Sequence, residues 1–124
     1  MRYLVSGSLI LAGIIHLLPL AGVLGNERLA VLYGIDTSDP NLSILLRHRA
    51  VLFGLLGAFL VVAGFRPGWQ AAALVAALVS VVSFLLLAWS TGGYNALIGR
   101  VVTADIVALA ALLVGAIAWW RSAA

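Results

Sequence analysis

The chain has 124 residues, of which 65% are hydrophobic and only 9% are charged, and its mean hydropathy is +1.20. Soluble globular domains carry roughly a quarter charged residues, so this composition excludes a fold exposed to water on all sides and indicates one solvated by lipid. The net charge of +3 comes from seven arginines spread along the chain, which argues against nucleic-acid binding, and the absence of cysteine excludes disulfides and thiolate-bound metals.

The first predicted element is a transmembrane helix over about residues 3–25. A helix needs about 20 apolar residues to cross a hydrocarbon core of roughly 30 Å. The apolar stretch is longer than the core of a signal peptide and lacks a convincing cleavage site, so we expect the helix to be retained. His16 lies within it, near Pro19, whose ring leaves the carbonyl of Ile15 without a helical donor.

A polar connection, NERLAVLYGIDTSDP, follows over residues 26–40. Asn26 is a suitable N-cap for a short helix that ends near Gly34. The apolar side chains of this helix lie on one of its sides. Such a helix would lie along the membrane interface. We expect this segment to cover one end of the protein, with Glu27 and Tyr33 as lid residues.

Three more transmembrane helices are predicted, over about residues 40–65, 69–90 and 95–120. Asp39 and Pro40 form a typical helix start, and the turn sequences RPG and TGGY separate the helices that follow. Short connections make successive helices antiparallel neighbours. The predicted fold is therefore an all-α membrane protein with a single domain, residues 1–124. It forms a four-transmembrane-helix up-down-up-down bundle with a short interfacial helix between spans one and two.

The two ends of this predicted bundle differ in charge. End A is the end with both termini and the 66–68 turn, and end B is the end with the 26–40 connection and the 91–94 turn. End A carries Arg2, Arg66 and Arg121, whereas three of the four acidic residues lie in the 26–40 connection. The positive-inside rule therefore places both termini in the cytoplasm. The wealth of Ala, Gly and Arg without Lys is typical of a GC-rich bacterial genome, which predicts a bacterial inner (plasma) membrane.

Polar side chains at a similar depth below end B are the main functional signal, because an ionisable group inside a span costs about 3 kcal/mol unless it pairs or faces a wet cavity. Arg47 shares a helical face with small residues and is expected to point inward. Arg49 lies about 200° further round the helix and is expected to extend along the lipid towards end B. The predicted pocket residues are His16, Arg47, His48, Ser83 and Asp105, and the predicted lid or mouth residues are Glu27, Tyr33, Arg49 and Arg100.

This polar layer has a structural and a functional interpretation. In the structural one, Asp105 pairs with Arg47 and His16 bonds a carbonyl or Ser83, which fixes helix register because such contacts are worth about 0.6 to 2 kcal/mol. In the functional one, the excess of cations over a single acid requires an anion. The layer would then be a pocket that binds a small amphiphilic or anionic molecule, lipid or quinone-like.

Other interpretations stay open. A membrane-embedded isomerase or oxidoreductase would use His16 and Asp105 for proton transfer. A purely structural subunit would form homo-oligomers through Gly and Ala helix faces. His16 and His48 would also suit haem, but histidines inside a membrane are more often hydrogen-bonded structural groups. No cofactor or metal is therefore predicted, with haem and quinone as the alternatives, and the predicted partners are membrane lipid and the small ligand.

Three stretches carry a family resemblance: HLLPLAGVLG in span one, LYGI in the connection, and LLRHRAVLFGLLGAFLVVAGF in span two. They resemble a family of small bacterial four-helix membrane proteins, loosely similar to the DoxX-like group, in which an Arg and a small-residue stretch open the second helix. Similar chains are sometimes labelled phosphopantetheine adenylyltransferase, but that soluble α/β enzyme has an HxGH motif that this sequence lacks. The resemblance implies a four-helix fold and redox or quinone-related partners.

Overall fold

The structure is a computed structural model, and it describes residues 2–19, 33 and 39–123. Within this part of the chain it is helical, with no strand. Its elements are α1 (Arg2–Leu17), α3 (Pro40–Ala63), the short 3-10 helix η2 (Pro67–Trp69), α4 (Gln70–Thr91) and α5 (Ala96–Ala123). The helical class expected from composition is therefore confirmed.

Three of these helices are long and apolar enough to cross a membrane: α3, α4 together with η2, and α5. These correspond to the second, third and fourth predicted spans. Helix α1 is apolar but has only 16 residues. The end of the first predicted span, residues 20–25, and most of the predicted interfacial helix lie outside the described residues. A helical bundle with three such helices is the architecture of a membrane protein.

The predicted helix boundaries have local causes. The side chain of Asp39 accepts a hydrogen bond of 2.9 Å from the backbone N–H of Asn41, and Pro40 occupies the first turn of α3. Helix α4 ends at Gly92, whose φ of +64° favours glycine. The side chain of Asn95 accepts a 2.8 Å hydrogen bond from the N–H of Ile98 and so caps the start of α5.

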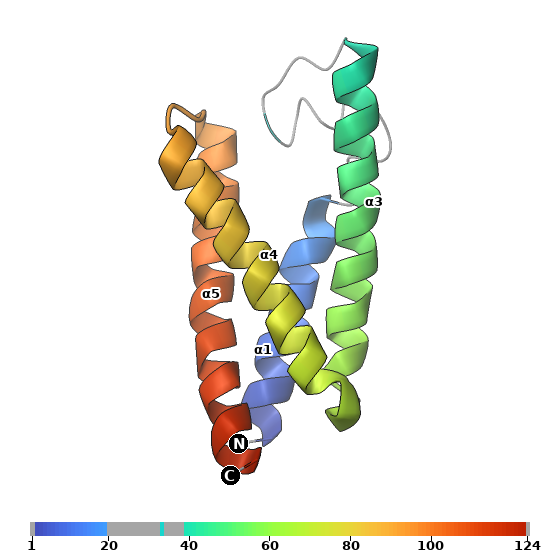
Figure 1. Cartoon of the computed structure of the whole chain (residues 1–124), viewed down its shortest axis with the longest axis vertical. Helices are drawn as coiled ribbons and strands as arrows, with labels where there is room; N and C mark the ends of the chain where they lie inside the picture. The colour runs from blue at the N-terminus through green and yellow to red at the C-terminus, as the bar shows by residue number, and fades with distance from the viewer. Residues whose placement is uncertain (1, 20–32, 34–38, 124) are drawn as a thin grey trace.

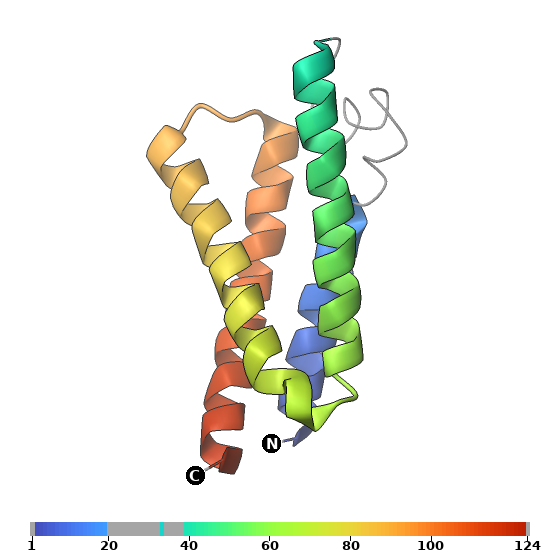
Figure 2. The same cartoon turned by 45° about the vertical axis from the view of Figure 1, so that its right-hand side comes forward.

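Helix α1 packs mainly against α3 and α5, and α4 packs mainly against α5. Figure 1 shows α4 crossing the bundle from the foot of α3 to the top of α5, with the N and C termini together at end A. The turned view in Figure 2 shows that α3 and α4 move apart towards end B. The four largest fully buried side chains are Leu9, Leu60, Val81 and Leu112, one from each helix. No residue of α3 before Ala50 is buried.

The backbones of α1 and α3 touch where two glycines face each other. A methyl carbon added to Gly57 would lie 2.8 Å from the carbonyl oxygen of Gly13, and one added to Gly13 would lie 2.9 Å from that of Gly57. Such contacts require the absence of both side chains. Gly57 therefore lies at a close helix contact, and Gly54 is buried as well.

We expect Gly57→Ala to lower stability by about 1–3 kcal/mol, because the new methyl group would force α1 and α3 apart. The measurement is thermal unfolding of the detergent-solubilised protein. Gly7→Ala is the matched control, since a methyl group there meets nothing within 4 Å and alanine is the better helix former. Equal unfolding temperatures for the two variants would contradict the close contact.

Candidate functional site

A cavity of about 350 Å³ lies in the end B half of the protein, where α3 and α4 diverge. Most of its lining is apolar, with Ile15, Leu18, Phe53, Phe84, Leu97 and Val101 among the side chains that form it. Among the described residues, five polar or charged side chains also reach it: His16, Tyr33, Arg49, Arg100 and Asp105. An apolar cavity with a few converging polar groups is the usual form of a small-molecule site.

His16 is almost completely buried at the floor of this cavity and uses both of its ring nitrogens. Its Nδ1 lies 2.7 Å from the carbonyl oxygen of Ala12, which can only accept, so Nδ1 carries the proton. Its Nε2 lies 2.9 Å from the hydroxyl of Ser80 and, in a neutral ring, accepts from it. The ring centroid also lies 5.5 Å from that of Phe53. His16 thus connects α1 to α4 and packs on α3.

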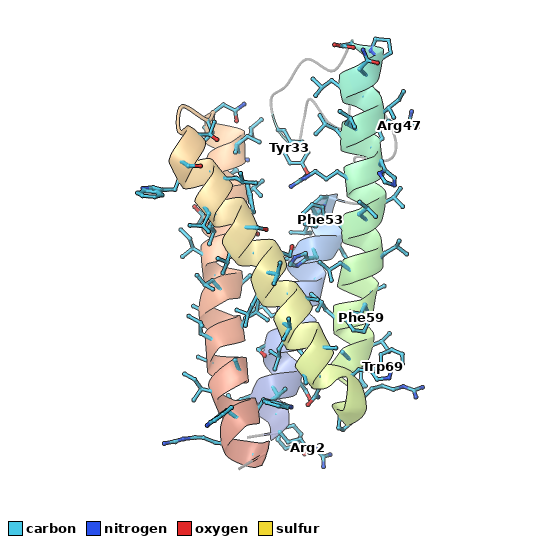
Figure 3. All side chains as sticks on the ribbon, in the orientation of Figure 1. Arg2, Tyr33, Arg47, Phe53, Phe59 and Trp69 are labelled. Carbon is cyan, nitrogen blue, oxygen red and sulfur yellow. The ribbon has the colours of Figure 1, made fainter. Side chains whose placement is uncertain are left out.

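Arg49 lines the cavity, and its guanidinium is positioned by defined side-chain contacts. Its Nη1 donates a 3.0 Å hydrogen bond to the hydroxyl of Tyr33, and its guanidinium carbon lies 4.3 Å from the ring centroid of Phe53. Figure 3 shows Tyr33 and Phe53 on the inner side of α3. Arg49 lines the same cavity as His16 and as Asp105, which carries the opposite charge. An arginine stacked on an aromatic ring keeps several N–H donors available for an anion.

Helix α5 supplies the other two charged groups. Asp105 is partly buried and Arg100 is exposed, and both line the cavity. Among the described residues, Asp105 forms neither a hydrogen bond nor a close ion pair, and its charged neighbour is Arg49. Among the described lining residues, Arg49, Arg100 and Asp105 carry charge when His16 is neutral, which leaves one positive charge in excess.

The expected orientations of two arginines are wrong. Arg47 is exposed and does not line the cavity, whereas Arg49 does. Figure 3 shows Arg47 on the outer side of α3. Gly57 marks the contact of α3 with α1, not with the cavity. Arg47 lies about three helical turns from Gly57, nearer end B.

Two further pocket candidates are placed elsewhere. His48 is exposed and lies outside the cavity, so the two histidines do not form a pair of facing haem ligands. Ser83 is also exposed, and its hydroxyl donates to the carbonyl of Ser80 instead of to His16. Glu27, the predicted lid residue, lies outside the described part of the chain. Of the nine predicted site residues, the structure brings together the five polar residues that line the cavity.

Sequence reasoning missed the role of Ser80. The sequence did contain an indication of this role, because Ser80 continues the stripe of small residues formed by Ala73, Ala76 and Ala77 on α4. Ser83 lies one turn nearer end B, and the choice between them depends on the depth of His16. Within the described residues, no three His, Asp or Glu side chains gather in a way that would hold a metal ion.

No protein-family model matches the chain, and no curated protein or solved structure does so either.

We expect Ser80→Ala to lower stability by about 1 kcal/mol, because it leaves Nε2 of the buried His16 without its protein partner. Thermal unfolding in detergent measures this change. Ser83→Ala is the matched control, one turn away on the same helix, and should alter the unfolding temperature little. A ¹⁵N spectrum of the imidazole should show the proton on Nδ1. A proton on Nε2 alone, or equal effects of the two substitutions, would contradict the assigned hydrogen bonds.

Proposed function

We propose that this chain is a four-span bacterial inner-membrane protein whose end B cavity binds a small amphiphilic anion, lipid or quinone-like. The observation that carries the proposal is the position of Arg49. Its guanidinium is held by Tyr33 and Phe53 inside an otherwise apolar cavity. Holding a charge there is costly unless an anion completes its pairing.

The shape and charge of the cavity support an amphiphile over a small inorganic anion. A volume of about 350 Å³ is at the lower end of the range for small-molecule sites. The aromatic side chains of Phe53 and Phe84 suit an apolar ring or chain, whereas Arg49 and Arg100 suit an acidic group. The cavity therefore offers each half of an amphiphile a matching surface.

The proposed topology extends the described helices. Helix α1 alone rises about 24 Å, and the apolar sequence as far as Gly25 would complete a span. Four spans then run up, down, up and down, with end A and both termini in the cytoplasm. The three arginines Arg2, Arg66 and Arg121 support this orientation. The cavity would open towards the opposite side of the membrane, below the 26–40 connection.

Proton transfer by His16 is a weaker alternative on the observed contacts. A general base needs a nitrogen free to meet its substrate, but Ala12 and Ser80 engage both nitrogens of the ring. The DoxX-like resemblance, with its redox-related partners, stays a prediction. A haem absorption band in the purified protein would support the oxidoreductase alternative.

We expect wild-type protein extracted in a mild detergent to retain an amphiphilic anion, and Arg49→Gln to lower the retained amount at least about tenfold. The reason is that a hydrogen bond to a charged group is worth about 1.5–3 kcal/mol. Native mass spectrometry, followed by mass analysis of the released molecules, measures the retained amount.

Arg47→Gln is the matched control for this experiment. It removes the same charge two residues away, but outside the cavity. It should leave retention unchanged, and both variants should be compared after their folding has been checked by thermal unfolding. Equal retention by the two variants, or a wild-type protein that retains no anion, would refute the proposed function.

A further inference from the structure

A second pocket, of about 620 Å³, lies at end A between the start of α1 and the connection from α3 to α4. We call it the end A groove. Its polar lining comes from Arg2, Tyr3, Ser6 and Gln70, and Phe65 contributes an apolar wall. Figure 3 shows Arg2 and Trp69 at this same end of the protein. The groove is remote from the end B cavity and shares no lining residue with it.

Gln70 is the unusual residue of the groove. Only 8% of it is exposed, and its side-chain amide forms no hydrogen bond with any described residue. A buried amide without a partner costs free energy, and buried side-chain polar groups are satisfied in the large majority of cases. Because Gln70 lines the groove, a molecule bound there would supply the missing partner.

The charges around the groove define the chemistry of that molecule. Arg2 is the charged side chain among the described residues that line the groove. Neither acidic residue that the structure describes, Asp39 or Asp105, lines the groove. Gln70 is also the first residue of α4, and the start of a helix favours negative charge. The groove therefore suits an anion with hydrogen-bond acceptors.

The apolar surroundings identify the source of the anion. Phe65 is 75% exposed and Tyr3 is 82% exposed, and both stand beside an arginine in the sequence. Exposed aromatic and arginine side chains at the end of apolar helices are typical of the membrane interface, where lipid headgroups lie. A phospholipid would place its phosphate at Arg2 and Gln70 and its chains along Ile10 and Phe65, which also line the groove.

We propose that the end A groove is a phospholipid site, in which Arg2 and the Gln70 amide bind the phosphate of an anionic lipid such as phosphatidylglycerol. The amide N–H groups donate to a phosphate oxygen, and the guanidinium pairs with its charge. This site is separate from the proposed end B cavity and does not depend on it.

The test is a titration of delipidated protein in a neutral detergent with phosphatidylglycerol, followed by native mass spectrometry. We expect Gln70→Leu and Arg2→Gln each to weaken lipid binding about tenfold, because each removes a hydrogen bond to a charged group. Gln70→Leu should leave the unfolding temperature of the lipid-free protein unchanged or raise it, since it replaces an unpaired buried amide by an apolar group of similar size.

Three comparisons make the test specific. Arg66→Gln removes a charge at the same end but outside the groove lining, and it should change binding little. The effect of Gln70→Leu should persist in the Arg49→Gln variant, whose end B cavity has lost its cation, so the two proposals can fail separately. Inorganic phosphate at the same concentration should not displace the lipid. Unchanged lipid binding by Gln70→Leu, or displacement by inorganic phosphate, would overturn the assignment.

Discussion

The contact of α1 with α3 at Gly13 and Gly57 fixes the geometry on which the cavity depends. In lipid, apolar side chains do not drive helices together, so close backbone packing and a few polar contacts select the helix partners. With the two backbones in contact, the residue one turn beyond Gly13 meets the residue one turn before Gly57. These residues are His16 and Phe53, whose rings lie 5.5 Å apart.

His16 also links α1 to a third helix, α4. Its Nε2 meets Ser80 near the middle of α4, and beyond that point α4 leans towards α5 and away from α3. On α3, Arg49 and Phe53 line the space that opens between α3 and α4, together with Tyr33 from the connecting segment. The glycine contact and the hydrogen bond of His16 to Ser80 thus join α1 to α3 and to α4 at the floor of the cavity.

The two ends of the protein present cationic groups in different settings. At end B, Arg49 is enclosed among aromatic rings and shares its cavity with Asp105, which favours a ligand that is mostly apolar with one acidic group. At end A, the exposed Arg2 and the buried amide of Gln70 line one groove, which favours a headgroup at the membrane surface. In the two proposed sites the same residue type would bind different ligands, because burial and neighbouring groups differ around each arginine.

The sequence by itself determined the helical membrane class and the boundaries of three helices, since these follow from local composition and from short signals such as Asp39-Pro40, Gly92 and Asn95. It also predicted that polar residues of several helices would lie at one depth, because the helical rise converts sequence position into depth. Five of the nine expected residues share the cavity.

Only the tertiary structure decided which side of each helix faces the cavity. The small residues of α3 indicated a packed face, but the sequence does not say which neighbour occupies that face. In the structure α1 packs there at Gly57, Arg47 is exposed and Arg49 lines the cavity. The choice of Ser80 over Ser83 likewise depends on the crossing of α4 over α1 at His16, a relation between distant segments that local patterns do not encode.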